Sequence, residues 1–183
     1  MTVIDLAKSE AKLLTLRKHG DGRGFFCESF RQKDHPGIAF VQDNLSLSAA
    51  PGTVRGLHFQ SPPFAQAKLV TVLRGAIFDV AVDLRRGSPG YGRWTSAALD
   101  AETLNQFLIP AGFAHGFCTL APDTLVLYKV DAYYSPAHDH GVLWNDPALG
   151  IRWPVDPEAA ILSEKDRRLP PLSAIDSPFV YPG

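Results

Sequence analysis

The sequence predicts an all-β fold, an antiparallel sandwich or barrel, from three observations. Fifteen glycines and fifteen prolines interrupt the chain at short intervals, which favours many short strands over a few long helices. Residues 76–84 (AIFDVAVDL) alternate as a strand does, with Asp79 and Asp83 on the face opposite Phe78, Val80 and Val82. Several more segments of strand length follow at the spacing typical of antiparallel sandwiches and barrels.

The expected elements cover most of the chain. A strand at 68–74 (KLVTVLR) precedes the one at 76–84, and Gly75 marks a tight connection between them. A turn-rich loop is expected at 85–92, followed by strands within 91–99, 104–110, 114–120 and 124–134. Helix is expected only near residues 5–12 and in short turns near 100–106 and 157–162. Because no repeat, low-complexity tract or linker interrupts this series, residues 1–183 are predicted to form a single β domain.

Charge and hydropathy limit the functional classes. Eighteen Lys and Arg against nineteen Asp and Glu leave a net charge of −1, so the charge balance favours neither nucleic acid nor an anionic membrane as a partner. The first residues do not read as a secretory signal, and no apolar run approaches the roughly 18 residues of a membrane span. A cytoplasmic protein is therefore expected. Cys27 and Cys118 lack the spacing of a metal or redox pair and are expected to be buried, reduced thiols.

A series of short motifs carries more specific information. In chain order they are DGRGFF (21–26), FVQDN (40–44), VRGLHFQ (54–60), DVAVDLR (79–85), IPAGFAHGF (109–117), LYKV (127–130), YYSP (133–136), WNDP (144–147), IRWP (151–154) and LSEKD (162–166). Their order and spacing resemble the dTDP-4-dehydrorhamnose 3,5-epimerase family of nucleotide-sugar enzymes from about residue 21 to residue 166. The resemblance implies a jelly-roll, cupin-like barrel, a homodimer, and a ligand in the barrel mouth.

The resemblance also implies an isomerase activity. The reaction would be the 3,5-epimerisation of dTDP-4-dehydro-6-deoxy-D-glucose to dTDP-4-dehydro-L-rhamnose, with no cofactor, because the ketone at carbon 4 acidifies both neighbouring carbons. Three alternatives stay open from the sequence. They are a mono-epimerase that inverts carbon 3 or carbon 5 alone, a catalytically silent sugar-binding module of the same fold, and a metal-dependent cupin oxygenase or isomerase.

The segment PAGFAH (110–115) has the Pro-x-Gly-x-x-His spacing found in the second half of a cupin signature, which raises the question of a metal. Metal-binding cupins need two histidines one residue apart and then a carboxylate. Here His58 is followed by Phe59 and Gln60, and Lys68 supplies an ammonium where a ligand would lie. A divalent cation would be repelled by that ammonium, so no catalytic metal is expected.

His58 is the candidate general base. A core histidine bonded to a backbone carbonyl is the structural alternative. In a regular strand, however, His58 shares a face with Val54, Gly56 and Gln60, and Gly56 leaves that face poor in bulk, as the wall of a ligand site is. The resemblance pairs His58 with Asp166, which alone would look like a surface acid. An imidazole titrates near neutral pH, and a carboxylate on its far nitrogen fixes the tautomer.

Arg55 points away from His58 in an ideal strand. Either Gly56 allows a bulge that redirects the chain, or Arg55 reaches a ligand around an edge. A surface salt bridge is the structural alternative. The resemblance places Arg55 on the nucleotide diphosphate, where a guanidinium pairs well with phosphate oxygens.

Lys68 and Tyr128 are the remaining candidate catalytic residues. Lys68 shares a face with Val70 and could extend to solvent, but its ammonium could also stabilise the enolate that forms when a carbon beside the ketone is deprotonated. Tyr128 could be a packed core tyrosine. The resemblance makes it the general acid that returns a proton to the face opposite the base, without which the starting sugar would simply be regenerated.

The substrate-binding residues are implied by the resemblance alone. They are Arg23, Phe26 and Glu28 for the neighbouring subunit's site, Phe26 with Tyr134 around the thymine ring, Gln42 and Asn44 for the nucleotide, and His115 and Lys165 near the sugar and phosphate. Each has an ordinary alternative role in packing, in a turn or in the barrel wall. Asp139 stands where the family commonly has a glutamate, which shortens the reach of that acceptor.

Overall fold

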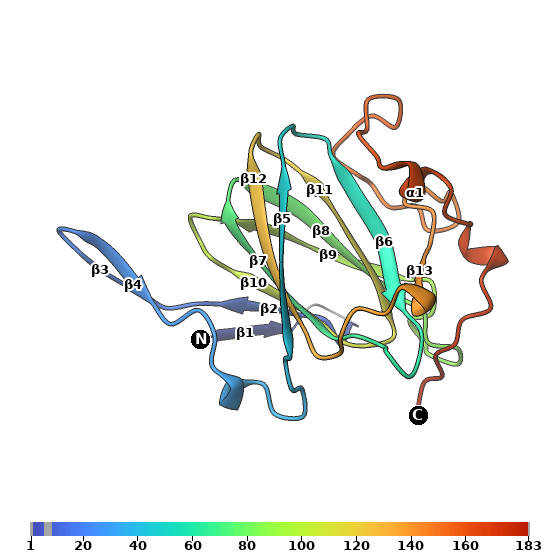
Figure 1. Cartoon of the computed structure of the whole chain (residues 1–183), viewed down its shortest axis with the longest axis horizontal. Coiled ribbons are helices and arrows are strands. Elements are labelled where there is room, and N and C mark those ends of the chain that lie inside the picture. Colours follow the sequence, from blue (N-terminus) through green and yellow to red (C-terminus); the bar gives the residue numbers. More distant parts are fainter. Residues whose placement is uncertain (1, 6–8, 183) are drawn as a thin grey trace.

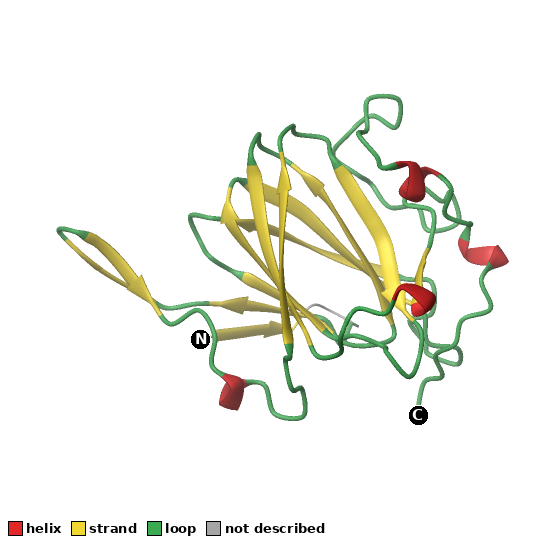
Figure 2. Cartoon of the chain, viewed as in Figure 1, coloured by secondary structure: helices red, strands yellow, loops and turns green. Residues whose placement is uncertain are grey.

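The computed structural model describes residues 2–5 and 9–182, and two antiparallel sheets account for most of the regular structure among them (Figure 1). Helix in this described part is limited to α1 (Glu164–Arg167) and to the 3-10 turns η1 (Gln32–Asp34), η2 (Pro136–His138) and η3 (Leu172–Ala174), all outside the sheets (Figure 2). None of these helices is long and apolar enough to cross a membrane. The predicted all-β antiparallel class is confirmed.

The larger sheet has six described strands. Their spatial order is β1 (Thr2–Asp5), β2 (Lys12–Thr15), β10 (Gln106–Ile109), β7 (Lys68–Arg74), β12 (Thr124–Val130) and β5 (Gln42–Ser48). Strand β5 therefore forms one edge of this sheet, next to β12, with Asn44 opposite Tyr128.

The smaller sheet has five described strands. Their spatial order is β13 (Asp139–Gly141), β6 (Val54–Gln60), β11 (Phe113–Thr119), β8 (Ala76–Asp83) and β9 (Trp94–Asp100). Strand β6 thus lies between β13 and β11, and His58 is directly opposite His115 on β11.

The connection between β7 and β8 carries the chain from one sheet to the other in a single residue. Gly75 has a φ of +79°, a conformation that side chains disfavour, and a Cβ there would lie 2.3 Å from the Thr124 hydroxyl. The tight connection predicted at Gly75 is confirmed, and the bounds of β7 match the predicted 68–74. Strands β9 to β12 likewise occupy the four segments expected after the loop at 85–92.

Two apolar layers hold the sheets in place. One lies between the sheets and combines side chains of both, such as Val72 and Phe107 from the larger sheet with Ala81 and Phe117 from the smaller one. The other covers the outer face of the smaller sheet, where the C-terminal segment packs Phe179 against β6 and β8. Apolar side chains therefore fill most of the space between the two sheets.

A two-stranded arm extends from the body of the molecule (Figure 1). It consists of β3 (Lys18–Asp21) paired with β4 (Gly24–Cys27). Phe25 and Phe26 on β4 are 55% and 70% exposed. Large aromatic side chains exposed on a projecting hairpin are typical of a surface that another chain covers.

Some expectations about local structure are wrong. The helix near residues 5–12 is replaced at both ends by strand, since Asp5 ends β1 and Lys12 begins β2, while residues 6–8 lie outside the described residues. The last predicted strand ends at Val130 rather than 134, because the Asp131 carboxylate turns inward to accept the Ala67 N–H at 2.7 Å.

Turns at 101–103 and 157–159 are found as predicted. Of the two thiols, Cys118 is buried and Cys27 only half-buried, and both are unpaired.

Candidate active site

A cavity of about 230 Å³ opens between the two sheets. The larger sheet contributes Ser46, Lys68 and Tyr128 to its lining. The smaller sheet contributes Arg55, His58, His115 and Phe117. The segment around α1 closes one side with Ser163, Lys165 and Asp166. All four predicted catalytic residues therefore meet in one cavity.

A bulge in β6 brings Arg55 and His58 to the same side of the sheet. Arg55 pairs with Phe117 and His58 pairs with His115, so three steps on β6 match two on β11. A Cβ at Gly56 would lie 2.6 Å from the His115 carbonyl oxygen, and the φ of +110° is one that glycine alone adopts readily. Of the two alternatives for Arg55, the structure has the bulge. The expectation that Val54 shares the face of His58 is wrong, because Val54 packs on the outer side.

The His58 imidazole is hydrogen-bonded to Asp166, and both side chains line the cavity. Its Nε2 lies 2.6 Å from Asp166 Oδ1, and Asp166 is 3% exposed. Burial raises the pKa of the Asp166 carboxyl, but hydrogen bonds from His58, Ser163 and the Gly56 backbone outweigh it and leave the pKa below its usual value. An ionised Asp166 can only accept, so the proton of His58 lies on Nε2 and the lone pair lies on Nδ1.

A second imidazole–carboxylate pair lies beside the first, and its acid had no predicted role. His115 Nε2 is 2.6 Å from Oδ1 of Asp79, which is fully buried on β8. Burial lowers the pKa of His115 more than Asp79 raises it, and the nearby Lys68 and His58 lower it further. His115 is therefore a neutral side chain whose Nδ1 can accept a hydrogen bond.

Lys68 lies at the end of the apolar stripe of β7, but its ammonium does not reach solvent. The side chain is 8% exposed, and Nζ donates to the His58 carbonyl at 3.4 Å. Burial lowers the pKa of Lys68 to about 8, although Asp139 and Asp79 act in the opposite direction. A compact cation thus lies in a buried site, where its field is less screened than at the surface.

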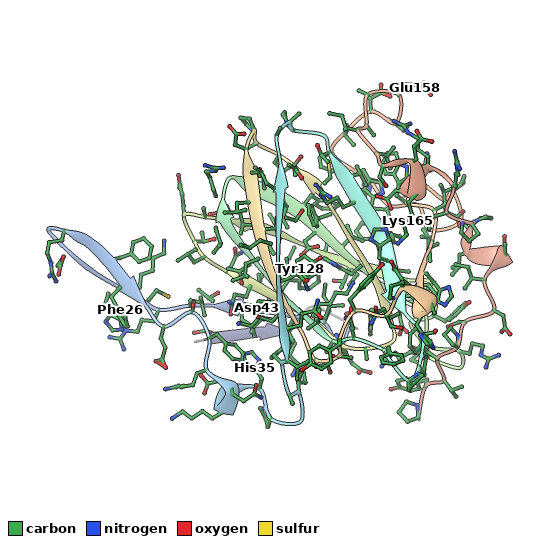
Figure 3. All side chains as sticks on the ribbon, in the orientation of Figure 1. Phe26, His35, Asp43, Tyr128, Glu158 and Lys165 are labelled. Atoms are coloured by element: carbon green, nitrogen blue, oxygen red, sulfur yellow. The ribbon has the colours of Figure 1, made fainter. Side chains whose placement is uncertain are left out.

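Tyr128 enters the cavity from the sheet opposite His58 and lies near the middle of the molecule (Figure 3). Burial raises the pKa of its phenol, and Asp139 raises it further against the opposing effect of Arg55, so the hydroxyl keeps its proton at neutral pH. The neighbouring hydroxyl of Ser46 on β5 is buried and has no hydrogen-bond partner among residues 2–5 and 9–182.

The mouth of the cavity is bordered by a polar network centred on Asp139. The Tyr134 hydroxyl and the Lys165 ammonium both donate to Asp139 Oδ2, at 2.9 Å and 2.5 Å. Tyr134 also donates its backbone N–H to Gln42, whose amide donates to Asn44 at 2.8 Å. These five predicted binding residues therefore form one connected border, although only Lys165 lines the cavity itself.

Three predicted binding residues lie away from this cavity. Arg23 and Phe26 are on the arm, and Glu28 follows it. Arg23 pairs with Asp21 at 2.6 Å and is 91% exposed, while Glu28 lies 3.4 Å from Arg31. Figure 3 places Phe26 on the opposite side of the molecule from Lys165. None of the three lines the cavity of its own chain.

Four residues in or beside the cavity were not singled out from the sequence: Ser46, Asp79, Phe117 and Ser163. Asp79 was recognisable as a carboxylate within an apolar strand, which rarely occurs without a partner. Ser163 was recognisable too, because Ser-x-x-Asp is a helix-start pattern, and Ser163 Oγ accepts the Asp166 N–H at 3.1 Å. Within the described residues no three His, Cys, Asp or Glu side chains are grouped as metal ligands.

Comparison with known proteins identifies the family. The family model described as dTDP-4-dehydrorhamnose 3,5-epimerase matches residues 5–174. The chain belongs to the dTDP-4-dehydrorhamnose 3,5-epimerase family. It is 54% identical over 180 residues to the epimerase of that name from Sinorhizobium fredii, a match covering 96% of this chain and 92% of the relative.

Solved structures of epimerases agree with this assignment. A dTDP-4-dehydrorhamnose 3,5-epimerase from Bacillus anthracis with TDP and pyrophosphate bound is 54% identical, with a TM-score of 0.88 over 93% of this chain and 98% of that one. An epimerase from Legionella pneumophila in complex with dTDP-4-keto-L-rhamnose is 42% identical, with a TM-score of 0.94 over 100% of this chain and 99% of that one. The predicted cupin-like fold and the predicted dTDP-4-dehydrorhamnose 3,5-epimerase activity are confirmed.

Proposed function

We propose that the cavity between the sheets is the active site, with His58 as base, Asp166 as its orienting partner, Lys68 as enolate stabiliser and Tyr128 as acid. The observation that supports it is the arrival of His58 and Tyr128 in one cavity from opposite sheets. Epimerisation needs a base and an acid on opposite faces of the sugar ring, and a pair from facing sheets meets that requirement.

Proton removal is assigned to His58. With its Nε2 proton held by Asp166 at 2.6 Å, Nδ1 is the nitrogen that takes the proton from carbon 3 or carbon 5. The imidazolium that forms is stabilised by the same carboxylate, whose low pKa keeps it charged. His115 is assigned a different role, as an acceptor for a sugar hydroxyl, because it is neutral and only 8% of its side chain is exposed.

Charge on the intermediate is assigned to Lys68. Removal of a proton beside the ketone moves negative charge to the oxygen on carbon 4. A pKa of about 8 leaves Lys68 largely protonated at pH 7, so a fixed cation is ready before the charge develops. The ketone supplies the acidity of both carbons, and the proposed steps therefore require no cofactor.

Proton return is assigned to Tyr128. Its raised pKa keeps the phenol protonated until the enolate needs a proton. A proton delivered from the larger sheet reaches the ring face opposite to His58, which inverts the carbon. The same pair acts at carbon 3 and at carbon 5, because both flank the one ketone.

The nucleotide is assigned to the open mouth of the cavity. A volume of about 230 Å³ is below the ~300–1,000 Å³ typical of a whole ligand pocket, so the sugar fits inside and the thymidine diphosphate lies outside. Arg55 and Lys165 are the cations for the phosphates, and Tyr134, Asp139, Gln42 and Asn44 border the thymidine. The nucleotides named in the two epimerase structures support this substrate class.

The arm is assigned to a second copy of the chain. Arg23, Phe26 and Glu28 do not line the cavity of their own chain, and Phe26 lies on the other side of the molecule from Lys165 (Figure 3). Leu45 and Leu47 on the edge strand β5 are 66% and 53% exposed, which provides an apolar surface for a partner. In a homodimer with two-fold symmetry each arm would complete the partner's site, with Phe26 stacking on the thymine opposite Tyr134. Cytoplasmic localisation stays a prediction.

The test of the proposed function is an NMR assay in deuterated water with dTDP-4-dehydro-6-deoxy-D-glucose. Deuterium is expected to enter carbon 3 and carbon 5, with conversion to the L-rhamno configuration. Exchange and inversion at one carbon only would favour a mono-epimerase, and no exchange at either would favour a binding module. Elemental analysis of the active protein tests the expectation that no metal takes part.

A further inference from the structure

The cavity contains one apolar side chain among its described lining residues. Phe117 is that residue, and the others carry a hydroxyl, an imidazole, a carboxylate or a cation. An isolated apolar surface in a polar site contacts whichever part of the ligand has no hydrogen-bonding group. The position of Phe117 therefore indicates where an apolar part of the sugar lies in the cavity.

Phe117 is packed against the core below it. It lies on β11 two residues after His115 and on the same strand face, with their ring centroids 6.3 Å apart. It is 4% exposed and belongs to the apolar layer between the sheets together with Val126. Tyr128 packs against the same layer. The ring of Phe117 and the proposed acid are thus positioned by one packed unit.

We propose that Phe117 is a specificity-determining residue that binds the methyl group of the 6-deoxy sugar and so positions carbon 5 for inversion. This inference rests on the proposed function. The methyl group is the one wholly apolar substituent of the substrate's sugar ring, and it is attached to carbon 5. Contact between the methyl group and Phe117 fixes the position of carbon 5 relative to Tyr128, whereas carbon 3 bears a hydroxyl and is positioned by polar groups.

The test compares two substrates on each protein variant. One is dTDP-4-dehydro-6-deoxy-D-glucose and the other is the corresponding dTDP-4-ketopentose, which lacks the methyl group. The measured quantity is kcat/KM for deuterium uptake at carbon 5, with uptake at carbon 3 as an internal reference. The ratio between the two substrates in one preparation does not depend on the fraction of protein that is folded, so partial unfolding of a variant cannot imitate the effect.

The variants are Phe117→Ala and Phe117→Leu, with Phe113→Leu as a matched control. Phe113 lies on the same face of β11, is also 4% exposed and belongs to the same apolar layer, but it does not line the cavity. The native protein is expected to prefer the methyl-bearing substrate at carbon 5 by roughly 10-fold. Phe117→Ala is expected to reduce that preference to near one, Phe117→Leu to reduce it partly, and Phe113→Leu to leave it unchanged.

The inference is overturned if Phe117→Ala lowers the rates for both substrates equally, because the ring would then serve the fold alone. It is also overturned if Phe113→Leu changes the preference as much as Phe117→Leu does. Failure of the proposed function looks different, because the native protein itself would then exchange neither carbon of the methyl-bearing substrate.

Discussion

His58 and His115 are direct partners in the register of β6 and β11, and each imidazole bonds its own carboxylate at 2.6 Å. Asp166 approaches from α1 and Asp79 from β8, so two similar pairs occupy one wall of the cavity. They differ in access. The side chain of His58 is 30% exposed and that of His115 is 8% exposed. A base that must reach a carbon-bound proton has to be the accessible one, which favours His58.

His58→Ala is expected to lower deuterium uptake at carbon 3 and carbon 5 by ~10²–10⁴-fold, the usual contribution of a general base. Asp166→Asn is expected to lower kcat with a smaller change in KM, because an amide no longer fixes the His58 tautomer. The exposed Glu164→Gln on the same helix is the control. The assignment is wrong if His115→Ala abolishes uptake while His58→Ala retains it.

Tyr128→Phe is expected to separate exchange from inversion. Without the phenol, the proton removed by His58 returns from the same face, so deuterium still enters while the configuration is kept. Inversion should fall by ~10²–10⁴-fold, and exchange should fall much less. NMR of the recovered sugar measures both. Tyr133→Phe is the control, since Tyr133 is 66% exposed and outside the cavity. A parallel loss of exchange and inversion would remove Tyr128 from the role of acid.

Lys68→Met is expected to make the protein more stable and less active. Burial of a cation disfavours the folded state, as the pKa of about 8 against an ordinary 10.5 indicates. At pH 7 the substitution should raise the free energy of unfolding by about 1–3 kcal/mol while kcat falls. Denaturant titration and the exchange assay on the same preparation provide the two measurements. A destabilised variant would show that the ammonium has better partners than its contacts suggest.

The lowered pKa of Lys68 also predicts how stability and activity change with pH. Between about pH 8 and pH 10.5 the unfolded chain binds the Lys68 proton and the folded chain does not, so this group makes stability rise with pH in that window. Activity should fall in the same window, because the neutral amine no longer stabilises the enolate. Comparing native protein with Lys68→Met at several pH values isolates this contribution from those of other lysines and tyrosines.

Two inactive variants should restore activity when they are mixed, if the arm serves the partner's site. Phe26→Asp retains its own His58, and His58→Ala retains an intact arm. After subunit exchange, heterodimers would carry one complete site, giving about a quarter of native activity for random pairing. The control is a mixture of His58→Ala with Tyr128→Phe, which share one cavity and should show no recovery. Absence of recovery with the arm variant, or a fully active monomer by light scattering, would contradict the arrangement.

Ser46→Ala is expected to weaken substrate binding without weakening the fold. The Ser46 hydroxyl is buried without a hydrogen-bond partner in the part of the chain that the structure describes, so its removal should leave the Tm unchanged or higher. If a substrate oxygen satisfies this hydroxyl, KM should rise several-fold with little change in kcat. A lowered Tm with unchanged KM would instead assign Ser46 to the fold.

The sequence predicts best where each strand follows its own local pattern. Strand β7 was predicted with its observed bounds, because Gly75 ends its apolar alternation. The face of His58 was predicted incorrectly, since parity assumes a regular register and the bulge at Gly56 depends on the approach of β11. No pattern within β6 reports how closely another strand will pack against it.

The candidate site shows the same division between local and distant information. The pairing of Asp79 with His115 joins residues 36 positions apart and follows from the register of β8 and β11, so it could not be predicted from either segment. Asp166 was identified through the family resemblance, and its burial became evident only in the folded chain. The proposed roles of Arg23, Phe26 and Glu28 depend on a second copy of the chain, and the pattern of a single sequence does not specify such contacts.

Gly56 and Gly116 allow β6 and β11 to approach each other more closely than side chains would permit. A Cβ at Gly56 would lie 2.6 Å from the His115 carbonyl oxygen, and one at Gly116 would lie 2.6 Å from the Arg55 carbonyl oxygen. Any larger residue at either position would force the strands apart and displace both histidines together. The two glycines therefore link the proposed base mechanically to its neighbour, and a substitution in this seam is expected to misalign both imidazoles at once.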